Sequence, residues 1–116
     1  MSELRKAPGA NRLPDVEAQV RFLSTSEGGR HGPAVSGYRP AHAVRDDYLT
    51  TGFHDYLDAD EAKPGDSVRA TITFITPEAY PGTLWVGKVV AVQEGEHVVG
   101  FATITKIFNE VLRLAG

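Results

Sequence analysis

Residues 26–40 read SEGGRHGPAVSGYRP, from Ser26 to Pro40, and this stretch organises the rest of the chain. It places four glycines, two prolines, two arginines and a histidine between two runs of extended character. Glycine takes a positive φ at little steric cost, and each proline fixes its own φ and favours an extended residue before it. We therefore expect a loop of defined shape between two strands.

Length and composition limit what such a loop can serve. The 116 residues fit one domain with a single core, and 41% of them are apolar. A net charge of −3 argues against a whole surface built to neutralise phosphates, so a nucleic-acid role would depend on a local patch. No apolar run is long enough to span a membrane. The absence of cysteine excludes disulfides and thiol chemistry and is compatible with the cytoplasm, which is the expected location.

Alternation of apolar and polar residues predicts an all-β chain. In the clearest strand, from Ser67 to Phe74, every second residue is apolar, and the strand beginning at Val16 places Glu17 on its solvent-facing side. Proline and glycine turns separate these runs, and no amphipathic helix of normal length is present. The expected strands cover residues 16–23, 39–48, 51–57, 67–74, 83–93 and 97–108. Such a chain forms an antiparallel sandwich or a closed barrel.

The remaining segments are expected to lie outside the strands. Residues 1–14 carry basic side chains but no apolar core of a signal peptide, and we expect a flexible tail. The folded domain then covers residues 15–108. Residues 109–116 form a short C-terminal extension with one helical turn, and residues 58–63 form a solvated acidic connection.

Several motifs in a fixed order give the chain a family resemblance. They are Glu27-Gly28-Gly29-Arg30-His31, Gly37-Tyr38-Arg39-Pro40, Pro64-Gly65-Asp66, Pro77, and Glu94-Gly95 with Gly100. In this order and spacing they resemble the C-terminal (third) domain of bacterial elongation factor Tu, over about residues 16–108. The resemblance implies a six-stranded antiparallel closed β-barrel, here as a stand-alone protein.

The resemblance also implies two interaction surfaces. In the family this domain contacts the T-stem backbone of aminoacyl-tRNA and docks against the GTPase domain. The RNA-contacting positions correspond to Arg30, His31, Glu94 and Gly95. The position near Ala91 faces the GTPase domain in the family, so the expected protein interface comprises Trp85, Val90, Ala91 and Val92.

Departures from the family pattern are informative. Thr76, Ala41 and His97 stand where the family has other polar, RNA-facing residues, so RNA binding is in doubt. The sequence also lacks the G-x-x-x-x-G-K-[ST] phosphate loop. We therefore expect no bound nucleotide and no GTPase activity of its own.

Each candidate residue also has a purely structural interpretation. Arg30 and His31 could serve only to stiffen their loop, and Tyr38 and Arg39 could close one end of the barrel through hydrogen bonds. Asp58, Asp60 and Glu61 lack the glycine and the terminal glutamate of a calcium loop. The remaining histidines, without the spacing of metal ligands, are His42, His54 and His97. No metal or other cofactor is expected.

Two binding functions remain after catalysis is considered. The sequence has no cysteine and no serine in a nucleophile-elbow pattern. It also has no pair of carboxylates in apolar surroundings that would shift a pKa, so we expect a protein that is not an enzyme. Our first hypothesis is a module that binds a protein partner or a second copy of itself. The alternative is a module that binds a tRNA stem or another structured RNA through its backbone. A hydrolase has no supporting sequence feature.

Overall fold

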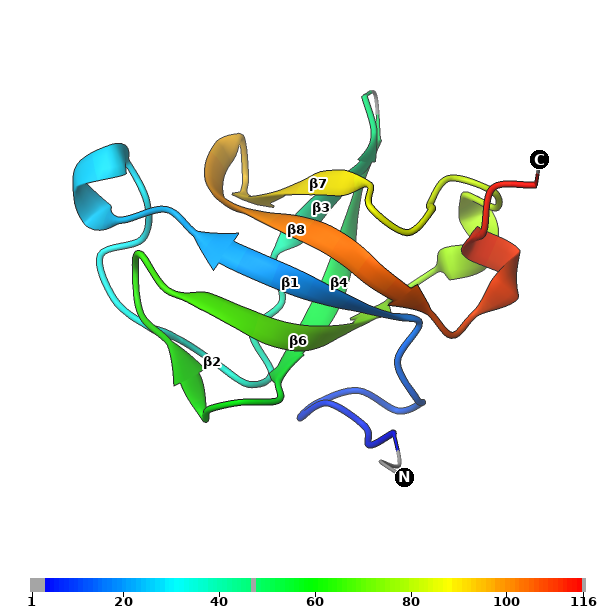
Figure 1. The fold of residues 1–116 in the computed structure, drawn as a ribbon, viewed down its shortest axis with the longest axis horizontal. Coiled ribbons are helices and arrows are strands. Elements are labelled where there is room, and N and C mark those ends of the chain that lie inside the picture. The colour runs from blue at the N-terminus through cyan, green and yellow to red at the C-terminus, as the bar shows by residue number, and fades with distance from the viewer. Residues whose placement is uncertain (1–3, 47, 116) are drawn as a thin grey trace.

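The structure, a computed structural model, describes residues 4–46 and 48–115. Six antiparallel strands close into a barrel in the order β1-β6-β4-β3-β7-β8, which confirms the expected fold (Figure 1). Their bounds are β1 Val16–Phe22, β3 Ala41–Arg45, β4 Tyr48–Tyr56, β6 Ser67–Phe74, β7 Val89–Glu94 and β8 His97–Ile107. Three single 3₁₀ turns cover Thr25–Glu27, Pro77–Ala79 and Glu110–Leu112, and no described helix could cross a membrane.

Alternation along the strands fills the barrel. The inward residues of β1 and β6 are all buried, as the sequence pattern predicted: Val16, Ala18, Val20, Phe22, Val68, Ala70, Ile72 and Phe74. Because β1 pairs with β6 on one edge and with β8 on the other, these residues face one closed interior. One prediction on the outer side of β1 was wrong. Glu17 was assigned to a solvent-facing position, but it is only 7% exposed.

Two strand predictions also need correction. The run expected at residues 83–93 is a strand only from Val89, because Gly87 has a φ of +99° and Lys88 N–H closes a turn by donating to the Trp85 carbonyl at 3.1 Å. The acidic connection at 58–63 contains a short strand, β5 Glu61–Ala62. It pairs with β2 Ala34–Val35, which lies inside the glycine-rich loop. This pairing ties the loop to the chain between β4 and β6.

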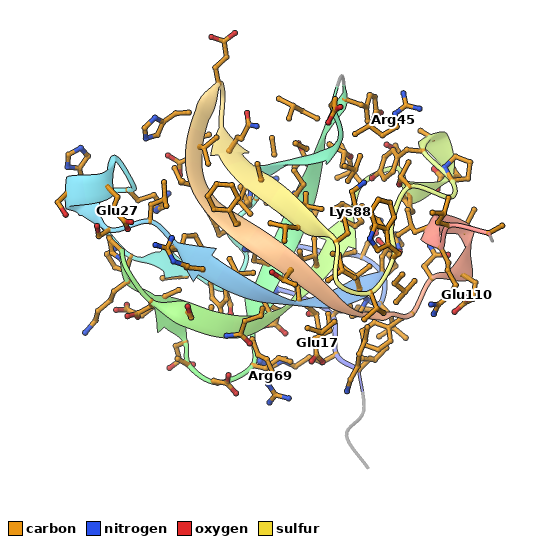
Figure 2. The ribbon with its side chains drawn as sticks, turned by 45° about the horizontal axis from the view of Figure 1, so that its top comes forward. Glu17, Glu27, Arg45, Arg69, Lys88 and Glu110 are labelled. Carbon is orange, nitrogen blue, oxygen red and sulfur yellow. The ribbon has the colours of Figure 1, made fainter. Side chains whose placement is uncertain are left out.

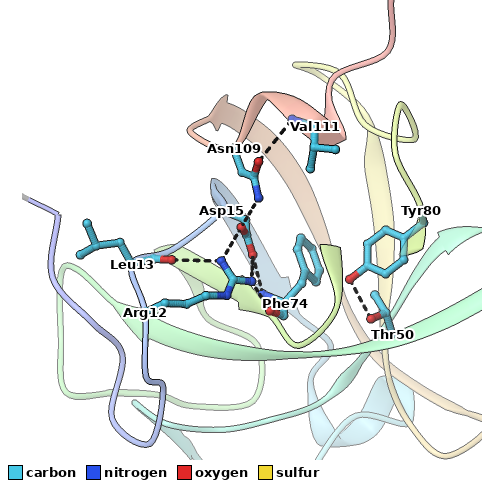
Figure 3. A network of polar contacts seen from close by, with 8 residues as sticks. All are labelled: Arg12, Leu13, Asp15, Thr50, Phe74, Tyr80, Asn109 and Val111. Carbon is cyan, nitrogen blue, oxygen red and sulfur yellow. Dashed lines mark hydrogen bonds and ion pairs between the residues drawn. The ribbon is translucent and has the colours of Figure 1, made fainter. Parts of the chain in front are cut away.

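A buried carboxylate links the N-terminal segment, β6 and the C-terminal turn. The Asp15 side chain, 1% exposed, accepts two hydrogen bonds from Arg12 at 2.8 Å and one from Phe74 N–H at 2.8 Å (Figure 3). Asn109 Nδ2 donates to the same carboxylate at 2.9 Å. The segment before Asp15 is also in contact with the barrel, since Arg5 pairs with the buried Asp55 at 2.6 Å. The flexibility expected for residues 1–14 stays a prediction.

The core contains a chain of polar side chains. His42 and His54, both fully buried, lie on neighbouring strands with their Nε2 atoms 2.8 Å apart. His42 Nδ1 lies 3.2 Å from the Thr50 carbonyl oxygen, which can only accept, so His42 donates there and accepts at Nε2. His54 must therefore donate from Nε2 and accept at Nδ1 from the Tyr56 hydroxyl, 3.1 Å away. Both imidazoles are neutral in this arrangement.

The glycine-rich loop has the defined shape that its sequence predicted. Ser24 caps the turn Thr25–Glu27 in a capping box, and Gly28 ends it in the left-handed region at φ 95°. Gly29 N–H then donates to the Ser24 carbonyl at 2.8 Å. A Cβ at Gly29 would lie 2.2 Å from the Leu23 carbonyl oxygen, so only glycine allows the chain to turn back this closely.

The buried histidine pair predicts a loss of stability in mild acid. Burial lowers the pKa of His42 to about 4, and burial with the neighbouring His42 lowers the pKa of His54 well below its usual value. Below about pH 6.5 the unfolded chain takes up protons that the folded chain does not, so the free energy of unfolding falls by up to about 1.4 kcal/mol per pH unit for each histidine. The loss begins at about pH 6.5 and continues to about pH 4 for His42.

Urea unfolding between about pH 7.5 and pH 5 measures this slope before most carboxylates titrate. His97→Gln removes an exposed imidazole and is the control, which should keep the slope of the unaltered protein. A free energy of unfolding that stays constant across this range would contradict the neutral buried pair.

The close turn at Gly29 predicts a strong difference between two glycines of the same loop. Gly29→Ala should lower the free energy of unfolding by about 1–3 kcal/mol, because its methyl group meets backbone oxygen atoms. Gly32→Ala is the matched control, since a Cβ there meets nothing within 4 Å, and it should change stability by less than about 1 kcal/mol. Urea unfolding of both variants decides the matter, and equal losses would show that the loop tolerates the methyl group.

Candidate functional site

The glycine-rich loop and the β7–β8 hairpin meet at one end of the barrel. Between them lies an open hollow of about 530 Å³, which we call the rim hollow. It is lined by Thr25, Gly28, Gly29, Arg30, His31, Gly32, Glu94 and His97. Three of the four residues expected to contact RNA therefore line one surface. The fourth, Gly95, is the exposed tip of the hairpin beside it, at φ 61°.

Arg30 is held by the protein at each of its three nitrogen atoms. Nη1 forms an ion pair with Glu94, Nε donates to the Gly32 carbonyl at 3.2 Å, and Nη2 donates to the Pro33 carbonyl at 3.2 Å. The guanidinium also stacks on the Tyr38 ring, 4.6 Å from its centroid. Arg30 thus fixes the shape of the glycine-rich loop and joins it to β7.

Glu94 is the acceptor that holds this group of side chains together. Its Oε2 also accepts a hydrogen bond from the Tyr38 hydroxyl at 2.5 Å. Partial burial acts to raise the pKa of Glu94, but the hydrogen bonds from Tyr38 and Arg30 outweigh it and lower this pKa below its ordinary value. Burial raises the pKa of Tyr38, which therefore stays protonated and donates. At neutral pH the charges of Arg30 and Glu94 compensate each other.

His31 and His97 are the accessible ring donors of the rim hollow. Both are exposed, and they come from the two different segments that form the hollow. The sequence identified His31 through the family resemblance, whereas it marked His97 only as a departure from the family. The ion pair between Arg30 and Glu94 was missed, because the two residues lie 64 positions apart in the chain.

A second surface lies at the start of β7. It includes Trp85 and Ala91, the two expected protein-interface residues that solvent can reach. Trp85, Val86, Val89 and Phe101 are between 39% and 57% exposed. Ala91 lies opposite Phe101 on the outer side of the β7–β8 pair, and Val89 lies opposite Thr103. We call the five residues Trp85, Val86, Val89, Ala91 and Phe101 the β7 apolar surface.

Lys88 contacts the indole of this surface through a cation–π interaction. Its Nζ lies 4.6 Å from the centroid of the Trp85 ring and donates to the carbonyls of Val44 and Thr83 at 2.6 and 2.7 Å. Burial lowers the pKa of Lys88. The exposed tryptophan is therefore positioned before any partner arrives, which reduces the entropy lost on binding.

The structure places the other two expected interface residues inside the barrel. Val90 and Val92 are 2% and 0% exposed, because alternate residues of β7 face the core. A partner cannot reach their side chains while the barrel is closed. Val89, which the sequence analysis did not include, joins the expected Ala91 on the outward side of β7.

The described residues contain no group of three or more His, Asp or Glu side chains able to hold a metal ion. His42 and His54 come together, which the sequence analysis did not foresee, but each uses both ring nitrogens on protein partners in the core. A neutral, enclosed pair cannot reach a substrate or ligate a metal without the barrel opening. Its role in the described structure is to satisfy polar groups in the core.

Comparison with known families agrees with the fold. Residues 10–108 match the family described as the elongation factor Tu C-terminal domain. The matched range contains all six strands of the barrel, the glycine-rich loop and the hairpin that form the rim hollow, and the whole of the β7 apolar surface. The chain therefore belongs to the elongation factor Tu C-terminal domain family.

Proposed function

We propose that this barrel is a non-catalytic binding module whose β7 apolar surface contacts a protein partner or a second copy of the chain. The family makes it a translation-factor-like β-barrel, and the domain that defines the family is itself non-catalytic. The proposed location is the cytoplasm, with which the absence of cysteine is compatible. No nucleotide or other cofactor is part of this proposal.

The observation that carries the proposal is the exposure of large apolar side chains at one place. Trp85 is 45% exposed, Val86 is 56% exposed and Val89 is 57% exposed. Covering such side chains gains roughly 25 cal/mol for each Å² of apolar surface removed from water. Tryptophan is also enriched among the residues that contribute most to protein interfaces. A protein surface of apolar character is the partner that these side chains fit.

Charge placed on this surface should abolish the interaction. Val86→Asp and Val89→Asp should each weaken self-association by at least about tenfold, as measured by sedimentation velocity. If the partner is another protein, each variant should reduce its recovery in pull-downs from the source cell by at least the same factor. The cause is that a carboxylate would have to be desolvated at the contact.

Val35→Asp is the matched control for these variants. Val35 is the same residue type, is 56% exposed like Val86, and lies on β2. The control should leave the interaction intact. A protein that is monomeric and recovers no partner, or that loses its partner equally in the control, would contradict this function.

Structured RNA is the second candidate, and the rim hollow is the observation that favours it. An arginine and two exposed histidines from separate segments surround one concave surface, as expected for contacts to a phosphate backbone. The ion pair between Arg30 and Glu94 opposes this function, because a phosphate would have to compete with Glu94 for the guanidinium. The two functions use different surfaces, so variants can separate them.

Binding of labelled tRNA at low salt, followed by fluorescence anisotropy, tests the RNA function. If Arg30 contacts phosphate, Arg30→Gln should weaken binding by roughly 1–3 kcal/mol and reduce the salt dependence by about one counterion. Glu94→Gln should have the opposite effect, because it removes the competing carboxylate. Val86→Asp lies outside the rim hollow and should leave tRNA binding unchanged. Weak binding that ignores both rim variants would eliminate this function.

A further inference from the structure

A third concave surface lies on the outer wall of the barrel, away from both surfaces described above. It is a pocket of about 270 Å³, which we call the wall pocket. Strands β1, β6 and β8 form its floor, and the N-terminal segment and the chain after β4 form its sides. It is lined by Arg5, Glu17, Arg69, Thr71 and Lys106, with Leu4 and Leu57 as the apolar members. Figure 2 shows Glu17 and Arg69 close together on this side of the barrel.

Glu17 is an unusual residue to find at the floor of this pocket. It is only 7% exposed, yet its carboxylate forms no hydrogen bond and no ion pair with any described residue. The carboxylate oxygens are not among the described side-chain atoms that are closed off from solvent without a partner. A charged residue with so little of its surface in water normally has a partner. Because it lines the wall pocket, the direction left open to the carboxylate is the pocket itself.

Two further groups beside Glu17 also lack partners. Thr71 lies directly opposite Glu17 on β6, and its hydroxyl is buried with no hydrogen-bond partner among the described residues. Lys106 lies opposite Glu17 on β8, and its ammonium pairs with no described group. Side chains opposite each other on neighbouring strands usually interact. Here a carboxylate and an ammonium line one small pocket with no hydrogen bond or ion pair between them, and the buried Thr71 side chain lies in its floor.

The two arginines of the pocket are already paired with acids. Arg5 binds the buried Asp55 through two nitrogens, and Arg69 binds the exposed Asp58 at 3.2 Å. Arg5 therefore serves mainly to hold the N-terminal segment over the pocket. Arg69 has the weaker partner, and its guanidinium stands half-exposed at the edge of the pocket. The unpaired charges are thus one negative group, Glu17, and one positive group, Lys106. Arg69 lies on β6, on the other side of β1 from Lys106.

We propose that the wall pocket binds a small zwitterion, namely a free α-amino acid with an aliphatic side chain. Its ammonium group donates to Glu17, and its carboxylate accepts from Lys106 and from Arg69. Its alkyl group packs on Leu4 and Leu57. A volume of about 270 Å³ lies below the roughly 300–1,000 Å³ of drug-sized sites and suits a ligand of this size. The proposal does not depend on the protein or RNA function.

The test is a titration of the isotope-labelled protein with L-leucine, followed by amide NMR shifts. Saturable shifts at β1, β6 and β8 around Glu17 are expected, with a Kd on the order of 1 mM or below. 4-Methylpentanoate is leucine without its ammonium group, and isopentylamine is leucine without its carboxylate. Each should bind at least about tenfold more weakly than leucine, since each forfeits a charge-assisted hydrogen bond.

Variants assign the binding to the two unpaired charges. Glu17→Gln keeps the side-chain shape and should raise the Kd for leucine at least about tenfold. Lys106→Met, on the exposed side of the pocket, should do the same without affecting folding. Glu96→Gln and Lys63→Met remove the same charges from exposed positions outside the wall pocket and should leave the Kd unchanged.

Three outcomes would overturn the proposal. The first is the absence of saturable shifts with leucine. The second is equal affinity for 4-methylpentanoate, which would indicate a simple anion site. The third is a Kd that Glu17→Gln and Lys106→Met do not alter. The same spectra show whether each variant is folded.

Discussion

The barrel closes because β1 is hydrogen-bonded along both of its edges, to β6 and to β8. This closure requires β8 to approach β1 very closely at Gly100, where a Cβ would lie 2.7 Å from the Arg21 carbonyl oxygen. Once the sheet is closed, the interior has a fixed volume, and only the inward residues can fill it. The fixed interior volume determines which apolar residues are buried and how the polar chain lies in the core. It also determines which side chains remain on the exposed surfaces.

Closure leaves room for two imidazoles in the core, and their hydrogen bonds decide how they can lie there. Gly52 makes the space, because a Cβ on it would be 2.8 Å from Ile72 and 3.0 Å from the His42 ring. The chain from Tyr56 through both histidines to the Thr50 carbonyl gives every ring nitrogen a partner with both rings neutral, the state that burial favours by lowering the pKa of each histidine. The polar core therefore costs little at neutral pH and gives the barrel one defined arrangement.

Local patterns in the sequence predicted most of the barrel strands, but not the loop before β7, the short pair β2–β5 or the contacts that the closed barrel creates. Alternation from Ser67 to Phe74 and the glycine hairpin at Gly95 predicted their elements well, because both signals are short-range. The loop at residues 83–88 was missed, since its apolar run resembles a buried strand and only the positive φ of Gly87 breaks it. The pairs His42 with His54 and Arg30 with Glu94 depend on strand register and on closure, which no local pattern encodes. Glu17 was misjudged because its position on the outer face does not reveal that the N-terminal segment covers it.

The internal charge balance of the rim hollow bears directly on the choice between the two proposed functions. A phosphate can take the Arg30 guanidinium only if Glu94 gives it up, and Glu94 would then keep a single donor, Tyr38. The same ion pair joins the glycine-rich loop to β7, so breaking it would also loosen the surface that the RNA is meant to contact. The β7 apolar surface has no such conflict, because Lys88 already holds Trp85 in an exposed position and a partner needs only to exclude water. This is the energetic reason for proposing a protein partner first, since that interaction keeps every contact that shapes the barrel.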